Sequence, residues 1–278
     1  MEVIYCKTLW GVTSEMGNCP SGYAALFARL KADGFTAIET PVWKIEDKAA
    51  FRAALDAVGM GYVAMINTAT PDAAGGPGAT HARPSQLLAD HLASFEAQVA
   101  EAAALRPLRI NSHSGCDLWP LATARAFFTR ALEVERACGL LVCHETHRGR
   151  VLYNPWAARD LCREFPALSL TADLSHFVCV AERVFHEEDE DWKACMAEFA
   201  RATKHIHARV GYAQGPQVPD PRAPEYLPAL TAHERWWDQI LGAWAGSGRQ
   251  RAAAPAGRRP LPSSPRLLTA RPPPLLPL

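Results

Sequence analysis

Short apolar runs of strand length alternate with longer segments of helical spacing over the first 245 residues of the chain. In the first unit, an apolar run at 3–6 precedes residues 21–32, where Tyr23, Phe27 and Leu30 recur at helical spacing. Six further apolar runs follow, at 35–38, 62–66, 108–110, 140–143, 168–172 and 204–210, together with helical segments at 45–58, 84–105, 121–137, 153–165, 192–203 and 225–244. Repeated strand–helix units of this kind predict a parallel sheet with helices outside it.

The size of the chain fits one large domain. It has 278 residues, 49% of them hydrophobic, and a single (β/α)8 barrel needs about 250 residues. Its eight cysteines are scattered without a CxxC pair, so we expect free thiols in a reducing cytoplasm. The chain begins with an apolar run of strand length, and we identify neither a signal peptide nor a transmembrane segment, which also favours a cytoplasmic protein.

The net charge of zero hides an uneven distribution of charge along the chain. Residues 246–278 contain six of the 29 basic residues and none of the 29 acidic ones, so the rest of the chain has a net charge of −6. A nucleic-acid-binding protein needs a basic face to neutralise phosphates. The charge balance therefore argues against nucleic acid as a partner.

Acids and imidazoles follow two consecutive apolar runs. His144, Glu145 and His147 come directly after the run at 140–143, in LLVCHETHRGR, and Asp173 and His176 come after the next run, in LSLTADLSHF. Parallel strands of a barrel build their sites where their carboxyl ends meet, at one rim. Carboxylate oxygens and imidazole nitrogens together suit a divalent metal ion. The alternative is a surface ion pair at 144–145 and a turn-capping role for Asp173.

The last predicted strand, KHIHARV, carries a third set of polar groups. Successive side chains of a strand point to opposite faces, so His205, His207 and Arg209 share one face, which in a barrel is the interior. A metal or an anionic substrate would explain three such groups facing inward; a structural polar cluster is the alternative. Glu39 and His113 also follow predicted strands, the second and the fourth.

These motifs, taken in order, resemble those of the xylose-isomerase-like (β/α)8 superfamily of sugar isomerases and epimerases, which also includes the apurinic-site endonuclease relatives. The resemblance covers about residues 1–245 and rests on the strand end at Glu39 and on HETHRGR, TADLSH and HIHARVGYAQGPQ. It implies a (β/α)8 TIM barrel over 1–245. The segment 246–278 is then a separate tail.

The resemblance also implies roles for single residues. One divalent metal, Mn²⁺, Mg²⁺ or Zn²⁺, would be held by Glu145, Asp173 and His207, with Glu145 and His176 as the catalytic groups. His207 is preferred to His205 as the ligand because it is nearer the carboxyl end of its strand. Substrate-binding roles would fall to Glu39, His113, His147, His205 and Arg209.

The function implied is that of a metal-dependent sugar or sugar phosphate isomerase or epimerase. Such an enzyme removes a proton next to a carbonyl and returns it elsewhere, and the metal stabilises the charge that develops. The alternatives are a non-catalytic relative that binds a sugar or polyol, and an apurinic-site endonuclease-like hydrolase. The expected partner is a small sugar-like molecule, with no nucleic acid and no membrane; a homo-oligomer is left open.

The chain departs from the family pattern at its carboxyl end. The eighth strand of the family delivers a second catalytic Glu, but the last glutamate here is Glu234. Residues 246–278 contain eight prolines and no aromatic residue, a composition that indicates disorder and opposes a central strand. We expect the eighth strand to be missing or degenerate and turnover to be impaired. The tail resembles a coding sequence read in the wrong frame; an evolved tail is the alternative.

Overall fold

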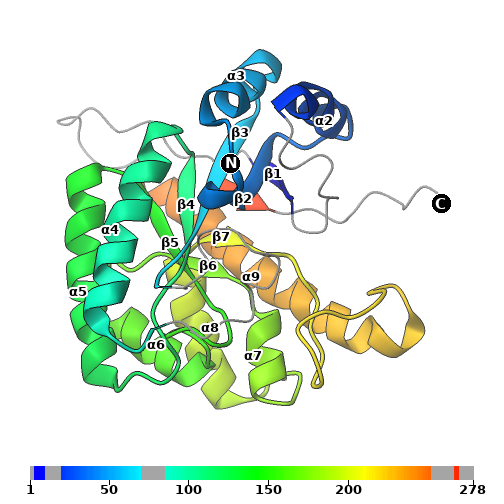
Figure 1. The fold of residues 1–278 in the computed structure, drawn as a ribbon. Coiled ribbons are helices and arrows are strands. Elements are labelled where there is room, and N and C mark those ends of the chain that lie inside the picture. Colours follow the sequence, from blue (N-terminus) through cyan, green and yellow to red (C-terminus); the bar gives the residue numbers. More distant parts are fainter. Residues whose placement is uncertain (1–2, 10–19, 70–84, 252–265, 269–278) are drawn as a thin grey trace.

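Eight parallel strands close into a barrel in the order β1 to β8 (Figure 1). The computed structural model describes residues 3–9, 20–69, 85–251 and 266–268. The strands are β1 (Val3–Thr8), β2 (Ala37–Pro41), β3 (Gly61–Asn67), β4 (Arg109–His113), β5 (Val142–Glu145), β6 (Leu170–Ala172), β7 (Thr203–Ile206) and β8 (Arg266–Leu268).

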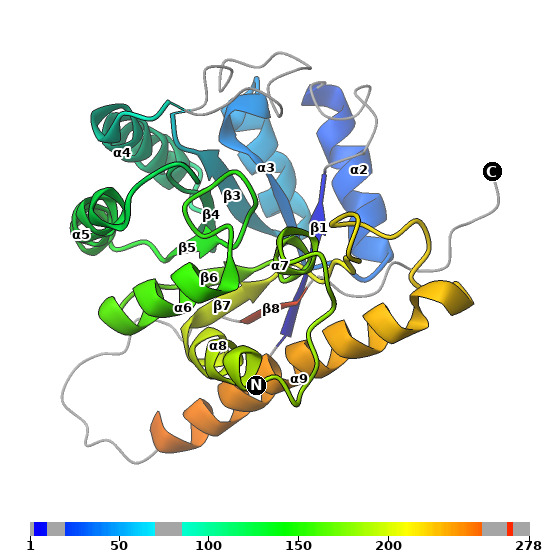
Figure 2. The same ribbon diagram turned by 90° about the horizontal axis from the view of Figure 1, so that it is seen from below.

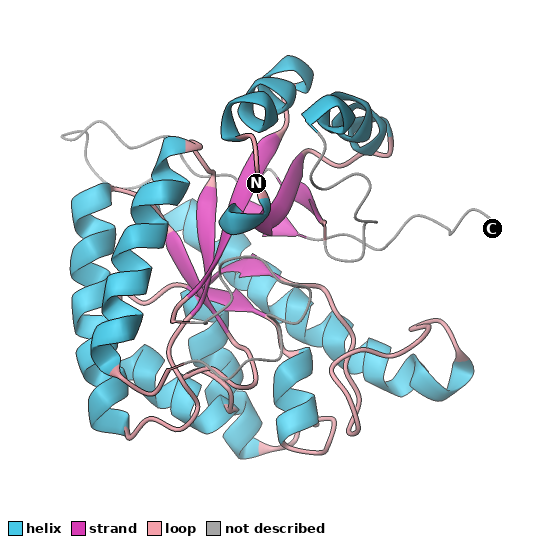
Figure 3. Ribbon diagram, viewed as in Figure 1, coloured by secondary structure: helices cyan, strands magenta, loops and turns pink. Residues whose placement is uncertain are grey.

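Helices surround the strands when the barrel is viewed as in Figure 2, and Figure 3 shows the same helix–strand alternation by colour. They are α2 (Pro20–Ala32), α3 (Lys48–Val58), α4 (Leu88–Ala104), α5 (Leu121–Cys138), α6 (Pro155–Glu164), α7 (Ser175–Val180), α8 (Glu190–Ala202) and α9 (Leu227–Arg251), with short 3-10 turns at Val42–Lys44 and Pro224–Tyr226. Within the described ranges, no helix is long and apolar enough to span a membrane.

Local sequence sets several of these helix boundaries. The side chain of Asp47 accepts a hydrogen bond from the Ala50 N–H and caps α3, which ends at Gly59 in the left-handed conformation. Asn154 caps α6 in the same way, with Pro155 in the first helical position. These signals are local, which is why the helical segments were predictable from the sequence.

The predicted (β/α)8 barrel is confirmed, with a degenerate eighth strand. β8 has only three residues, which pair in parallel with β1 and with β7. The helix before it, α9, runs to Arg251 and so passes the expected domain boundary at residue 245. The expectation of disorder for the rest of the tail falls on 252–265 and 269–278, outside the described residues.

Alternation along the strands separates two apolar layers. Ile4, Cys6, Ala37 and Val63 form a small cluster inside the lower part of the barrel. The opposite faces of the strands pack against the helices and form the main core, which includes Tyr62, Phe27, Phe51, Phe127, Phe199 and Trp236. Above the small cluster, the inward positions become polar, and this change places the site inside the carboxyl end of the barrel.

The helix α9 is attached to the chain on both sides of β7. Near its start, the His233 ring accepts a hydrogen bond from the Gly211 N–H over 3.3 Å, just beyond the carboxyl end of the strand. Near its end, the Trp244 indole N–H donates to the carbonyl of Thr203 over 2.7 Å, where the strand begins. Both contacts are buried, so α9 fixes the loop that carries Arg209.

The expected state of the cysteines is confirmed for the part of the chain that the structure describes. All seven cysteines there are free thiols, and five of them are buried.

Candidate active site

Glu145 and Asp173 lie at the carboxyl ends of neighbouring strands. Glu145 is the last residue of β5, and Asp173 follows β6 directly. Both side chains are almost fully buried, 3% and 2% exposed. Two ionisable acids at this depth need compensating partners, because a buried unpaired charge is costly.

Glu145 receives two close donors. Its Oε2 accepts from the Asn111 amide over 2.7 Å and lies 2.7 Å from the His113 Nε2. Burial raises the pKa of Glu145, but the positive charges of His113 and His207 outweigh burial and hold the pKa well below its usual range. The carboxylate is therefore ionised, as a metal ligand or proton acceptor must be.

Asp173 is held on both oxygens. Its Oδ2 lies 2.7 Å from the Arg209 guanidinium, and its Oδ1 accepts from the Ser175 hydroxyl. Its backbone N–H donates to the Thr146 hydroxyl over 2.9 Å. Burial raises the pKa of Asp173, but the charges of Arg209 and His176 outweigh it, so the pKa lies well below its usual range.

His207 lies between the carboxylates of three strands. Its Nε2 is 3.0 Å from Oε2 of Glu39, and its Nδ1 is 3.4 Å from Glu145 and 3.8 Å from Asp173. Burial lowers the pKa of His207, but the negative charges of Glu39 and Glu145 outweigh burial and raise the pKa well above its ordinary value. The positively charged form of the His207 imidazole is therefore favoured at the place where the three carboxylates converge.

The negative charges of the carboxylates that converge there outnumber the permanent positive charges in contact with them. Glu39, Glu145 and Asp173 supply three carboxylates, and Arg209 supplies one guanidinium in contact with Asp173. A protonated His207 offsets part of the excess. A divalent cation with His207 neutral would offset it more completely, so the donor set fits such an ion.

The substrate-side residues predicted from the sequence surround the same space. The His147 ring lies between two other imidazoles: it stacks on His113 with ring centroids 4.4 Å apart and is tilted against His176 with centroids 3.9 Å apart. Burial lowers the pKa of His176 to about 4 and that of His147 well below its ordinary value. At neutral pH these two rings are uncharged and can accept a proton or donate a lone pair.

The seventh strand is shorter than predicted, and this changes the position of Arg209. β7 ends at Ile206, and the chain then turns, with the Arg209 N–H donating to the carbonyl of His207 over 2.8 Å. His205 and His207 still face Glu39, as their alternation predicts. Arg209 instead reaches sideways to Asp173, Ser175 and His176.

Asn111 is a central residue that the sequence analysis missed. Its amide nitrogen donates to Glu39 over 2.9 Å and to Glu145 over 2.7 Å, so one side chain joins two acids. The signal was present, since Asn111 stands two residues before His113 and therefore shares its inward face. His144, by contrast, faces the helix layer, where it contacts Ser114 and Glu135 rather than the site.

Three groups of side chains bring metal-ligating atoms within 4.8 Å of one another in the described part of the chain: Glu39, His205 and His207; His113, Glu145 and His147; and Glu145, Asp173 and His176. The predicted set, Glu145, Asp173 and His207, spans the first and third of these groups. The structure thus brings all of the predicted ligands together, with His176, the residue expected to complete the shell when water does not, beside them.

Gly211 allows the loop after β7 to approach α7 closely. A Cβ at this position would lie 2.7 Å from the carbonyl oxygen of Ser175 and 2.8 Å from its Cβ. We therefore expect Gly211→Ala to reduce the free energy of unfolding by about 1–3 kcal/mol. At Gly242, in α9, a Cβ meets no atom within 4 Å, so Gly242→Ala should be neutral or raise stability by up to about 1 kcal/mol. Urea unfolding measures the free energy of unfolding of both variants. An equal change in Gly211→Ala and Gly242→Ala would contradict the steric argument.

The fold and the position of these side chains define a TIM-barrel protein with a candidate active site at the carboxyl ends of its strands. The chain belongs to the xylose isomerase-like TIM barrel family, whose model matches residues 27–218. The resemblance seen in the sequence is therefore confirmed.

Solved structures share the fold at low sequence identity. A D-allulose 3-epimerase from Methylomonas sp. is 16% identical with a TM-score of 0.54, and the match covers 84% of this chain and 82% of the epimerase. An AP endonuclease of family 2 from Brucella melitensis is 16% identical with a TM-score of 0.52, covering 84% and 88%. A xylose isomerase-like TIM barrel protein from Mycobacterium smegmatis, in complex with magnesium, is 13% identical with a TM-score of 0.50, covering 76% and 75%. A search of curated protein sequences gave no significant match.

Proposed function

We propose that this chain is a metal-dependent isomerase or epimerase of a sugar or sugar phosphate, which moves a proton next to a carbonyl. The observation that carries the proposal is the pair of buried, ionised carboxylates, Glu145 and Asp173, on neighbouring strand ends with His207 between them. A sugar is also the substrate class named for the similar D-allulose 3-epimerase.

In this proposal, Glu145, Asp173 and His207 hold one divalent cation, and His176 or water completes its shell. The ion supplies Lewis-acid polarisation of the substrate carbonyl when it is bound. The oxygen-rich part of this set suits Mg²⁺ or Mn²⁺, and the imidazole suits Zn²⁺ as well. The ionised state of both acids supports the assignment, because a ligand must be deprotonated.

The chain's own residues supply the proton transfer. Glu145 accepts the substrate proton at its carboxylate, whose orientation is fixed by Asn111 and His113. His176, uncharged at neutral pH and in contact with Arg209, is the second catalytic group. The substrate-binding positions in this proposal are Glu39, His113, His147, His205 and Arg209.

The missing acid on β8 favours a second candidate, a non-catalytic binder of a sugar or polyol. β8 has the sequence Arg-Leu-Leu, so the strand that carries the family's second Glu brings no carboxylate here. When one of the two groups that transfer protons on opposite faces of the substrate is lost, the rate falls by about 10²–10⁴-fold. We therefore expect slow turnover. Glu39 and His113 are the residues in this site best placed to take over the missing role.

A nucleic acid substrate is the least favoured candidate. Without residues 246–278, the chain has a net charge of −6, and a phosphate-binding face needs the opposite sign. We propose a small-molecule substrate and a cytoplasmic enzyme.

Deuterium exchange tests the proposal directly. The Mn²⁺-loaded protein should exchange the proton next to the carbonyl of a ketohexose or its phosphate in D₂O, as followed by proton NMR. Glu145→Gln should slow this exchange about 10²-fold or more, because it removes the proton acceptor. Glu101→Gln, on the surface, is the matched control and should exchange at the wild-type rate. A wild-type protein that binds the sugar without any exchange would establish the binder instead.

A further inference from the structure

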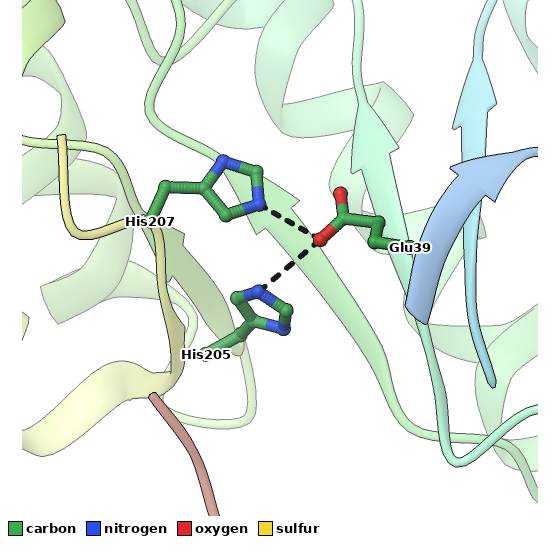
Figure 4. Close-up of side chains that lie close together, drawn as sticks. All are labelled: Glu39, His205 and His207. Atoms are coloured by element: carbon green, nitrogen blue, oxygen red, sulfur yellow. Dashed lines mark hydrogen bonds and ion pairs between the residues drawn. The ribbon is translucent and has the colours of Figure 1, made fainter. Parts of the chain in front are cut away.

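Glu39, His205 and His207 form a compact group of ligand atoms (Figure 4), here called the inner site, as distinct from the outer site at Glu145 and Asp173. Oε2 of Glu39 is 3.0 Å from Nε2 of His207 and 3.4 Å from Nε2 of His205. Ligand atoms around a tetrahedral ion with bonds of about 2.0–2.1 Å are about 3.3 Å apart. The two distances from Glu39 therefore already approximate those of a shared coordination sphere, and all three ligand atoms lie within 4.8 Å of one another.

His205 is the unusual member of the group. Its side chain is fully buried, its Nδ1 has no hydrogen-bond partner among the described residues, and its Nε2 makes only a 3.4 Å ion-pair contact with Glu39. Buried polar groups are rarely left without partners, since each such group costs about 1–3 kcal/mol. Figure 4 shows the His205 ring turned toward Glu39, with Nε2 facing the same carboxylate oxygen as His207. A cation at this point would satisfy that nitrogen.

We infer that Glu39, His205 and His207 form a second cation site, which takes Zn²⁺ rather than Mg²⁺ or Mn²⁺. Two imidazole nitrogens and one carboxylate oxygen are a common ligand set of zinc, with solvent in the fourth position. The harder ions prefer oxygen ligands, which Glu145 and Asp173 offer instead. The inference goes beyond the proposed function and requires no turnover.

The residues around the group complete a second coordination shell. If Nε2 of His207 binds zinc, its Nδ1–H faces Glu145 at 3.4 Å, the carboxylate–histidine arrangement common beside metals. Oε1 of Glu39 is fixed by the Asn111 amide at 2.9 Å, which leaves Oε2 for the ion. Both ligands are therefore oriented before the ion arrives.

His207 belongs to both cation positions. A neutral imidazole has one lone pair, so its Nδ1 can serve the ion at Glu145 and Asp173 or its Nε2 can serve the ion at Glu39, but not both. Zinc at the inner site should therefore displace manganese from the outer one. The two positions act as alternatives selected by the identity of the metal.

Equilibrium dialysis of the metal-stripped full chain against ZnCl₂ and MnCl₂, read by elemental analysis, tests the inference. The wild type should bind one zinc per chain, and zinc should reduce bound manganese. His205→Gln and Glu39→Gln should each weaken zinc binding by at least about 10–100-fold while manganese affinity changes only a few-fold. Asp173→Asn should show the reverse pattern. The visible spectrum of bound Co²⁺ should change in the first two variants only.

The controls distinguish zinc bound at the inner site from zinc bound to surface histidines. His186→Gln removes an exposed histidine and should leave zinc binding unchanged. Circular dichroism checks that each variant is folded. His205→Gln and Glu39→Gln lie on different strands, so the test still holds if one of the two variants does not fold. Zinc binding at the wild-type level in both His205→Gln and Glu39→Gln would overturn the inner site. One manganese and one zinc bound together would overturn the sharing of His207. Absence of deuterium exchange in the manganese-loaded wild type would contradict the proposed function alone.

Discussion

Asp173→Asn is expected to abolish manganese binding and to lower the rate of deuterium exchange by about 10³-fold or more. The substitution keeps the size of the side chain but removes the charge that faces both Arg209 and His207. Without that charge, the Arg209 guanidinium is left uncompensated and repels a divalent cation from the same space. Lewis-acid polarisation is worth several kcal/mol, which corresponds to this loss of rate.

Elemental analysis of the purified variant and the exchange rate are measured together. Asp160→Asn, an exposed aspartate in α6, is the control and should match the wild type in both. Equal manganese content in Asp173→Asn and wild type would remove Asp173 from the ligand set. A loss of metal without a loss of exchange would instead separate the ion from the chemistry.

The stability of the protein is expected to fall steeply between pH 6.5 and pH 4 because of two buried histidines outside the proposed metal-ligand set. Burial lowers the pKa of His91 and of His233 from 6.5 to about 4. In this window the unfolded chain binds protons that the folded chain does not, so the free energy of unfolding decreases as pH falls. The loss is on the order of 3 kcal/mol for each histidine over the window.

Urea unfolding at several pH values checks this expectation. His233→Gln keeps an acceptor for the Gly211 N–H but removes the titrating ring. The free energy of unfolding should therefore depend less on pH, by the equivalent of about one proton taken up on unfolding. Phe199→Leu, a core change, should lower stability equally at every pH and leave the slope as it is. Parallel pH curves for His233→Gln and wild type would contradict the assignment.

The barrel was predictable because its signals are local. Apolar runs and helical spacing recur in each unit, and caps such as Asp47 and Asn154 sit next to the helices they start. The convergence of Glu145 and Asp173 followed from one rule, that parallel strands end at one rim. The presence of β8 was harder to foresee, because three residues in a proline-rich tail give no periodic pattern.

Contacts between side chains on distant strands of the barrel could not be predicted from the sequence. Glu39 and His207 are 168 positions apart, and only closure of the barrel brings their side chains to 3.0 Å. The turn after Ile206 redirected Arg209 to Asp173, although strict alternation placed it with the histidines. Asn111 was missed because an asparagine two residues before a histidine gives no signal of its own in the sequence; its role follows only from the two carboxylates to which it donates.

The double attachment of α9 bears on how much variation the end of this chain can tolerate during evolution. The Gly211–His233 and Thr203–Trp244 contacts both involve residues that precede position 245. Insertions, deletions or a changed reading frame after that point would leave both contacts intact. The loop that carries His207 and Arg209 would keep its support. Changes in the tail therefore reach the site only through β8 and its pairing with β1 and β7, whereas changes before Trp244 would also remove the support of this loop.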